Sequence, residues 1–221
     1  MKLLLSAITK MIFGIALIGA MLFLPAWTFD YIGAWLFIGV LFVPMLFTGL
    51  VLFTKAPDLL KKRLDFKEKE KTQGGVIALS DIMFPIAFVL SAFDFRFAWS
   101  YVPIWLSITS AVLFLVGYAL YAEVLRENAY LARTVEVQQG QKVIDTGLYG
   151  IVRHPMYFAT FLMFLPLPLI LQSLWGLIPI ALYPVLIIVR IINEEKVLTE
   201  GLCGYKEYKT KVKYRLIPFI W

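Results

Sequence analysis

Side chains able to perform chemistry are scarce in this 221-residue chain. It contains one histidine, His154, and one cysteine, Cys203. A single cysteine excludes an internal disulfide and a cysteine-based metal cage. One histidine with scattered carboxylates is a poor ligand set for a transition metal. Glycine-rich phosphate loops and nucleophile–base pairs are also missing, so we predict a protein that uses no metal and no phosphate loop.

Charge is scarce as well. Charged residues make up 16% of the chain and hydrophobic residues 61%, with a mean hydropathy of +0.80. Soluble domains are about one-quarter charged and about half apolar. The net charge of +6 would suit nucleic acid, but the basic residues flank apolar runs. We therefore predict an integral membrane protein with membrane lipids as partners and no nucleic acid.

The apolar residues fall in stretches near the roughly 20 residues that a spanning helix needs. Their pattern is apolar all round, which is typical of helices that face lipid. Several prolines inside these stretches argue against strands. The sequence thus predicts an all-α, polytopic membrane protein of about six transmembrane helices, which cover Met11–Trp27, Tyr31–Phe53, Val76–Ala92, Val102–Ala122, Tyr157–Leu171 and Trp175–Ile192.

The connections between these spans alternate in charge. Every lysine and arginine except Arg96 falls before the first span, at or beyond the end of the last, or in the connections that follow the second and fourth. Basic residues collect on the cytoplasmic side of membrane proteins. The alternation predicts a multi-pass protein of the cell membrane with both termini in the cytoplasm.

We expect residues 1–122 to form a four-span region with a charged cytoplasmic loop at 54–75. We interpret this loop as solvated, with a short helix near anionic lipid head groups as a variant. Asp81 lies inside the third span. An ionisable residue there is a functional candidate, although local hydrogen bonding or reaching to water is the alternative.

Residues 123–221 hold the chemistry. A long polar segment, 123–150, is either a binding wall or a plain connector. It leads to His154, which Pro155 places at the mouth of the fifth span, because proline favours the first position of a helix. The spans 157–192 form a hairpin with a short turn, so His154 returns to the same membrane face as Arg190 and Glu194.

Arg190, Asn193 and Glu194 share one helical face. They form either a surface ion pair or the wall of a cleft in which each charge binds its own group. Beyond them, residues 205–215 read as an amphipathic helix on the membrane, with Tyr208, Val212 and Arg215 on one face. Cations, a carboxylate and aromatic rings suit a zwitterionic amino-acid group and a sulfonium. This chemistry suggests S-adenosylmethionine without specifying it.

The combined pattern resembles the isoprenylcysteine carboxyl methyltransferase family. It consists of Arg153-His154-Pro155-x-Tyr157, the hairpin, Arg190-x-x-x-Glu194-Glu195 and Tyr205-x-x-Tyr208. The resemblance covers about the last hundred residues. Phospholipid N-methyltransferases and membrane sterol reductases look similar across the same region.

The resemblance implies a cytoplasmic cofactor site. In it, His154, Pro155, Met156 and Tyr157 bind S-adenosylmethionine, and Glu194 binds its amino-acid end. Arg190 orients the methyl acceptor and forms the catalytic pair with Glu194. Glu195 and Arg153 support the cofactor site. The chain departs from the family at Ala159, where glycine is common.

The expected reaction is methyl transfer to a lipophilic acceptor, as carboxyl O-methylation of an isoprenylcysteine-like substrate. A carboxylate is ionised at neutral pH and needs no base, whereas an amine does. Three alternatives stay open: a phospholipid or amine N-methyltransferase, a sterol-reductase-like NADPH-dependent oxidoreductase, and a non-catalytic membrane protein.

Overall fold

A computed structural model describes residues 2–64, 71–131 and 137–221. Its described residues form helices and connecting segments, with no strand among them. The helices are α1 (Lys2–Ala26), α2 (Ile32–Lys55), α3 (Pro57–Leu64), α4 (Lys71–Phe97), α5 (Ile104–Glu127), the 3-10 helix η1 (Gly147–Gly150), α6 (Pro155–Phe164), α7 (Leu167–Ile170), α8 (Leu177–Ile180), α9 (Tyr183–Gly201) and α10 (Tyr205–Lys211).

Five apolar segments of the described chain are long enough to cross a membrane: Leu3–Ala26, Ile32–Lys55, Gly74–Phe97, Ile104–Glu127 and Leu177–Gly201. The polytopic all-helical fold is therefore confirmed. The fifth predicted span differs, because Pro155–Ile170 is a shorter apolar helix that breaks into α6 and α7 at Leu165 and Pro166. A proline cannot donate the helical hydrogen bond and ends α6 there.

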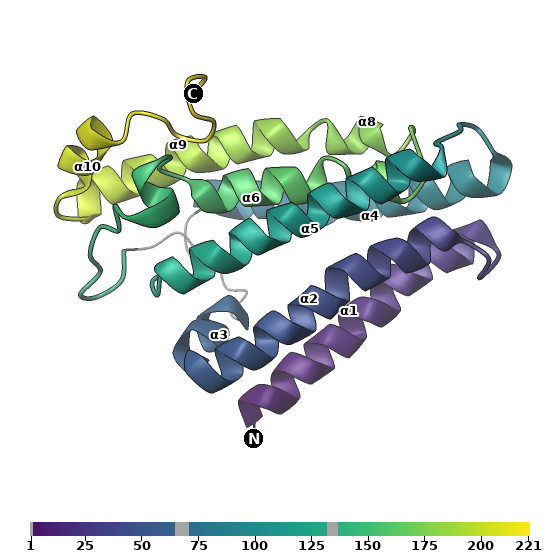
Figure 1. The fold of residues 1–221 in the computed structure, drawn as a ribbon, viewed down its shortest axis with the longest axis horizontal. Helices are drawn as coiled ribbons and strands as arrows, with labels where there is room; N and C mark the ends of the chain where they lie inside the picture. The colour runs from purple at the N-terminus through teal and green to yellow at the C-terminus, as the bar shows by residue number, and fades with distance from the viewer. Residues whose placement is uncertain (1, 65–70, 132–136) are drawn as a thin grey trace.

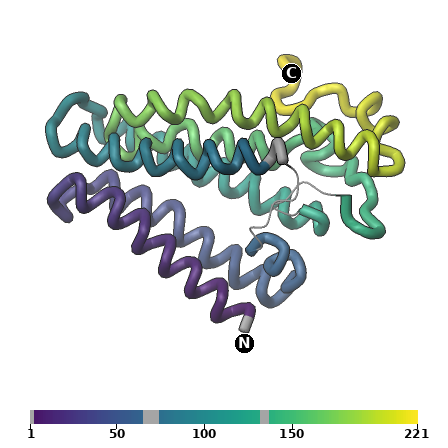
Figure 2. The backbone as a smooth tube through the Cα atoms, turned by 180° about the vertical axis from the view of Figure 1, so that it is seen from behind, coloured from purple at the N-terminus to yellow at the C-terminus, as the bar shows by residue number. Residues whose placement is uncertain are grey.

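The long helices run side by side along the long axis of the molecule (Figure 1). Both termini lie at one end, together with α3, η1 and α10. We call this the motif end, since it holds His154, and the opposite end the far end. The α1–α2 pair contacts α4 and α5 near the far end and diverges from them toward the motif end, as Figures 1 and 2 both show.

The far end is held together by a buried carboxylate, Asp94. Its side chain is 0% exposed and accepts hydrogen bonds from the hydroxyls of Ser100 (2.6 Å) and Ser173 (2.5 Å). Nearby, the Tyr31 hydroxyl donates to the Leu171 carbonyl at 2.5 Å. Buried polar groups need such partners. Asp94 therefore joins the turn of the predicted hairpin to the connection after α4. The helix α4 itself extends past the predicted end of the third span.

Exposed aromatic side chains surround this far end. They come from the α1–α2, α4–α5 and α7–α8 connections and the helix ends beside them, and are Trp27, Trp99, Tyr101, Trp105 and Trp175. Tryptophan and tyrosine concentrate at membrane–water interfaces. The far end therefore has the composition of a helical bundle where it leaves the lipid.

α5 and α6 pack closely because glycine faces alanine between them. A Cβ atom added to Gly117 would lie 2.8 Å from the Ala159 carbonyl oxygen, and Ala159 is itself fully buried. Small residues let membrane helices approach. Glycine is thus needed on α5, and the alanine in place of the family's glycine fits the contact.

The C-terminal helix is shorter than predicted. α10 ends at Lys211, and Val212 is already extended. Tyr205, Tyr208 and Val212 are buried together, so this face of the segment packs onto the protein. The reason is local, because the carbonyl groups of the following residues bind the chain around His154, as described next.

Candidate functional site

The 3-10 turn before His154 is shaped by a glycine. Gly147 has a φ of +52°, and a Cβ there would collide with the carboxylate of Glu127. That carboxylate accepts a hydrogen bond from the backbone N–H of Leu148 at 3.1 Å. His154 then caps α6, with Pro155 in its first turn. The predicted helix start at the His-Pro pair is confirmed.

The C-terminal segment pairs with this turn through the backbone. The N–H of Arg153 donates to the Tyr214 carbonyl, and that of His154 to the Arg215 carbonyl, both at 2.9 Å. The Arg153 guanidinium also donates to the carbonyls of Val212 and Lys213 at 2.8 Å. These bonds need an extended chain, which explains why α10 cannot continue.

Glu195 stands at the centre of a buried charge cluster. Its carboxylate, 4% exposed, accepts hydrogen bonds from Arg153 Nε at 2.6 Å and Arg215 Nε at 3.0 Å. His154 Nε2 lies 3.4 Å from the same carboxylate. A buried charge is tolerated when it is paired and hydrogen-bonded. Glu195 therefore joins α9, the His154 turn and the C-terminal segment.

Tyr157 links the two charged residues of the second cluster. Its hydroxyl accepts a hydrogen bond from Arg190 Nε at 2.8 Å and donates one to Glu194 at 2.5 Å. Its ring stacks on His154, with 5.7 Å between ring centroids. Arg190 and Glu194 therefore face the helix that carries the histidine motif, as the cleft interpretation of their spacing requires.

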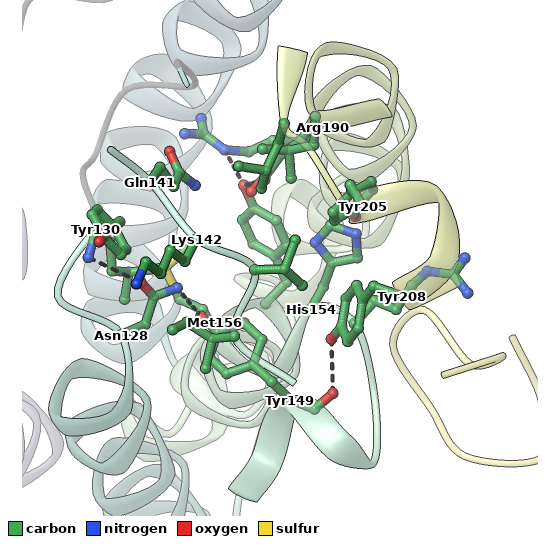
Figure 3. Close-up of a pocket in the computed structure, with 18 residues that line it drawn as sticks. Asn128, Tyr130, Gln141, Lys142, Tyr149, His154, Met156, Arg190, Tyr205 and Tyr208 are labelled. Carbon is green, nitrogen blue, oxygen red and sulfur yellow. Dashed lines mark hydrogen bonds between the residues drawn. The ribbon is translucent and has the colours of Figure 1, made fainter. Parts of the chain in front are cut away.

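A pocket opens beside these residues at the motif end, and we call it the polar pocket. It encloses about 820 Å³ of space between the side chains, including the open solvent at its mouth. Figure 3 shows its side chains converging from the α5–η1 connection, α6, α9 and α10. Charged or polar members are Asn128, Gln141, Lys142, Arg153, His154, Arg190 and Glu194.

Six predicted site residues line the polar pocket: Arg153, His154, Met156, Tyr157, Arg190 and Glu194. Two others, Pro155 and Glu195, are not among its lining residues. Pro155 is buried in the first turn of α6, and Glu195 is covered by its cationic partners. The structure thus brings the two predicted clusters together and separates the carboxylates: Glu194 faces the pocket, and Glu195 is buried behind it.

Four tyrosines that the motif did not assign to cofactor binding also line the pocket: Tyr130, Tyr149, Tyr205 and Tyr208. Asn128 donates to the Tyr149 hydroxyl at 2.9 Å, and the Tyr208 hydroxyl donates to the Tyr149 carbonyl at 2.7 Å (Figure 3). Burial raises the pKa of both phenols above the ordinary value, so they stay neutral. The sequence offered one signal for each: Tyr149 lies shortly before His154, and Tyr208 belongs to the Tyr205-x-x-Tyr208 pattern.

The Tyr205 hydroxyl differs from those of Tyr149 and Tyr208. It is buried and makes no hydrogen bond within the described part of the chain, although it belongs to a pocket-lining side chain. Such a group costs free energy unless it gains a partner. A polar ligand in the pocket would supply one. The pocket also offers a carboxylate, cations and aromatic rings, so it fits a zwitterionic cofactor.

A second, larger hollow lies between the diverging α1–α2 pair and the other helices. This apolar cavity holds about 2240 Å³ of space between the side chains, including the open solvent at its mouth. Most of its lining is aliphatic or aromatic, drawn from α1 to α6 and α9. Within the described part of the chain, its ionisable lining residues other than tyrosine are Lys10, Arg63, Asp81 and Arg190. Such a space suits an acyl or prenyl chain.

The two hollows meet. Met156, Tyr157 and Arg190 belong to the lining of both the polar pocket and the apolar cavity. A polar molecule in one and an amphiphile in the other would therefore face each other across these three side chains. Among the described residues, no group of three or more His, Cys, Asp or Glu side chains could hold a metal ion.

Comparison with known families identifies this part of the chain. Residues 105–203 match the model of the phospholipid methyltransferase family. This part of the chain is therefore similar to that family. The matched region contains the His154 motif, α9 with Arg190 and Glu194, and much of the wall of the polar pocket. The match supports a membrane methyltransferase. No curated protein matches the chain.

Proposed function

We propose that this protein transfers a methyl group from S-adenosylmethionine to a lipophilic acceptor at the cytoplasmic face of the cell membrane. The observation that carries the proposal is the shared wall of Met156, Tyr157 and Arg190. A water-soluble donor and a membrane-bound acceptor must meet without either leaving its own phase. Two hollows of opposite polarity that join at one wall provide that arrangement.

The polar pocket would hold the cofactor through its charged and aromatic side chains. Glu194 would bind the ammonium group, and Lys142 would bind the carboxylate. The phenol rings of Tyr149 and Tyr208 would lie against the apolar parts and favour a sulfonium by cation–π attraction. His154, whose ring stacks on Tyr157, would complete the floor. S-adenosylmethionine would supply the electrophilic methyl group.

Tyr157 holds the pocket in shape. Its hydroxyl fixes the side chains of Arg190 and Glu194 before any ligand binds. Arg153 and Glu195, which the resemblance assigned to cofactor binding, would act from behind by fixing the His154 turn. Pro155 would act likewise, by starting α6 at the correct residue.

For the acceptor we propose carboxyl O-methylation of an isoprenylcysteine-like substrate. A carboxylate is already ionised at neutral pH, and Arg190 stands where it would orient one. No base is then required, and the residues contribute alignment and exclusion of water.

N-methylation of a phospholipid amine is the second candidate. The description of the matched family favours it, and so does Asp81, a carboxylate in the wall of the apolar cavity. An ammonium group must lose a proton before it can accept a methyl group. Asp81 would attract such a cation. Glu194 would be the candidate base, because it is hydrogen-bonded to Tyr157 in the shared wall.

Calorimetry on the detergent-purified protein tests the cofactor. We expect S-adenosylhomocysteine to bind, and Glu194→Ala to weaken binding by about 10- to 100-fold, the range for a lost hydrogen bond to a charged group. Glu200→Ala is the control, since Glu200 is an exposed carboxylate on the same helix. Tight NADPH binding without S-adenosylhomocysteine binding would instead support a reductase, and no binding of either would support a non-catalytic protein.

The acceptor is tested with a radiolabelled methyl donor in membranes that contain the protein. A labelled lipid product that mild base releases as methanol is an ester and supports O-methylation. A labelled lipid whose head group keeps the label in base supports N-methylation and contradicts the carboxylate acceptor.

A further inference from the structure

The charged connection after α2 is more than a solvated loop. Its helix α3 carries two buried leucines, Leu59 and Leu60, which fix it against the bundle at the motif end (Figure 1). On α3, Lys62 donates a hydrogen bond to Gln138 at 2.6 Å, and Gln138 in turn donates to the Tyr130 carbonyl at 2.5 Å. Tyr130 lines the polar pocket. α3 is thus tied to the wall of the cofactor site.

The next residue, Arg63, reaches the apolar cavity. Its guanidinium donates a hydrogen bond to the Tyr121 hydroxyl on α5 and lies over the Tyr121 ring, 5.4 Å from the centroid. Its Nη1 atom is 4.0 Å from the sulfur of Met156. Met156 belongs to the wall that the two hollows share. Arg63 therefore stands beside the place where methyl donor and acceptor would meet.

Among the described residues of the cavity wall, the ionisable side chains other than tyrosine are three cations, Lys10, Arg63 and Arg190, and one anion, Asp81. The ammonium of Lys10 also donates to the last carbonyl of α3, that of Leu64, at 2.7 Å. The planar donors of a guanidinium match carboxylate and phosphate oxygens.

We propose that Arg63 is a specificity-determining residue, which together with Arg190 binds an anionic group on the acceptor. The inference rests on the proposed function. The acceptor is then an anionic amphiphile: its tail lies in the apolar cavity, and its carboxylate or phosphate lies between a guanidinium from α3 and one from α9. Carboxylate and phosphate share this chemistry, and the experiment separates them.

The test measures binding of simple amphiphiles to the full-length protein in phosphatidylcholine nanodiscs, with empty nanodiscs subtracted. The probes are dodecanoate, dodecyl phosphate and the neutral dodecanol, at mildly alkaline pH. Variants are Arg63→Gln, Arg63→Lys and the matched control Lys61→Gln, which removes an exposed charge from the same helix. S-adenosylhomocysteine affinity is measured on each sample.

Arg63→Gln is expected to weaken binding of at least one anionic probe by about 10- to 100-fold, the effect of losing a hydrogen bond to a charged group. Arg63→Lys restores part of the loss, while dodecanol and S-adenosylhomocysteine binding stay unchanged. Lys61→Gln behaves as the wild type. The anion that loses more affinity identifies the acceptor group as carboxylate or phosphate.

Unchanged affinity of Arg63→Gln for both anions overturns the proposal, and so does an equal loss in Lys61→Gln. If Arg63→Gln does not assemble, Tyr121→Phe replaces it, since it removes only the hydroxyl that holds the guanidinium. Wild-type anion affinity in Tyr121→Phe then overturns the role of Arg63. Failure of the proposed function is separate, because it appears as absent S-adenosylhomocysteine binding in the wild type.

Discussion

Replacing Glu195 by alanine is expected to destabilise the protein strongly. The substitution leaves the buried guanidinium of Arg153 and the side chain of His154 without their carboxylate. Removing one partner of a buried ion pair costs about 3–5 kcal/mol. A chain of this size loses about 2–4 °C of its unfolding midpoint per kcal/mol, so we expect a drop of about 6 to 20 °C.

The loss is measured by intrinsic tryptophan fluorescence during heating in detergent. Glu195→Gln keeps the shape of the side chain and removes its charge, so its unfolding midpoint should fall between those of the wild type and Glu195→Ala. Glu200→Ala is the control, since it removes an exposed carboxylate from the same helix. An equal midpoint for Glu195→Ala and Glu200→Ala would refute the assignment of Glu195 as the buried link between α9 and the C-terminal segment.

Four other substitutions or titrations test separate parts of the structure. Tyr205→Phe should leave the unfolding midpoint unchanged or higher, because it removes an unpaired buried hydroxyl, and should weaken S-adenosylhomocysteine binding in calorimetry by about fivefold. Asp81→Asn should tighten dodecanoate binding by up to about fivefold by removing a like charge from the cavity wall. Gly117→Leu should destabilise the protein in thermal unfolding by about 1–3 kcal/mol, since it overpacks α5 against α6. Burial raises the pKa of Tyr149 and Tyr208. The stability that these two phenols contribute is therefore complete below about pH 10, the ordinary pKa of tyrosine, and is lost as the pH rises above it. Their phenolate absorbance should appear only when the protein unfolds in alkali, and its appearance before unfolding would contradict their burial.

Much of the fold follows from the sequence. Long runs that are apolar all round can satisfy their backbone in lipid only as helices, so the positions of α1, α2, α4, α5 and α9 were predictable. The His154-Pro155 pair fixed the start of α6 for a local reason, the geometry of proline. The proximity of His154 to Glu194 followed from the short hairpin turn.

Other features depend on long-range contacts that spacing does not encode. Glu194 and Glu195 are adjacent, and only the positions of Arg153 and Arg215 decide which carboxylate is buried. Asp94 lies just beyond the predicted third span, and its partner Ser173 is far along the chain.

The position of α3 was not predictable for a related reason. Its charged residues are typical of a solvated loop or of a short helix near lipid head groups, whereas its place depends on two buried leucines and on long-range contacts such as that between Arg63 and Tyr121. The early ends of α6 and α10 arise from Pro166 and from backbone bonds to Arg153. Some predicted features, such as Arg133 and Glu136 of the polar segment and the acidic residues at 65–70, lie outside the described residues.

The two hollows draw on different parts of the chain. Every residue that lines the polar pocket falls between Asn128 and Tyr208, whereas most of the lining of the apolar cavity comes from α1 to α4. Changes in the first hundred residues outside α3, which is hydrogen-bonded to the wall of the polar pocket, can therefore alter which amphiphile is accepted with little effect on cofactor binding. A lineage of such proteins could exchange acceptors by varying its N-terminal helices alone. A chimera that joins the N-terminal half of one member to the C-terminal half of another should take its acceptor choice from the first member and its methyl donor from the second.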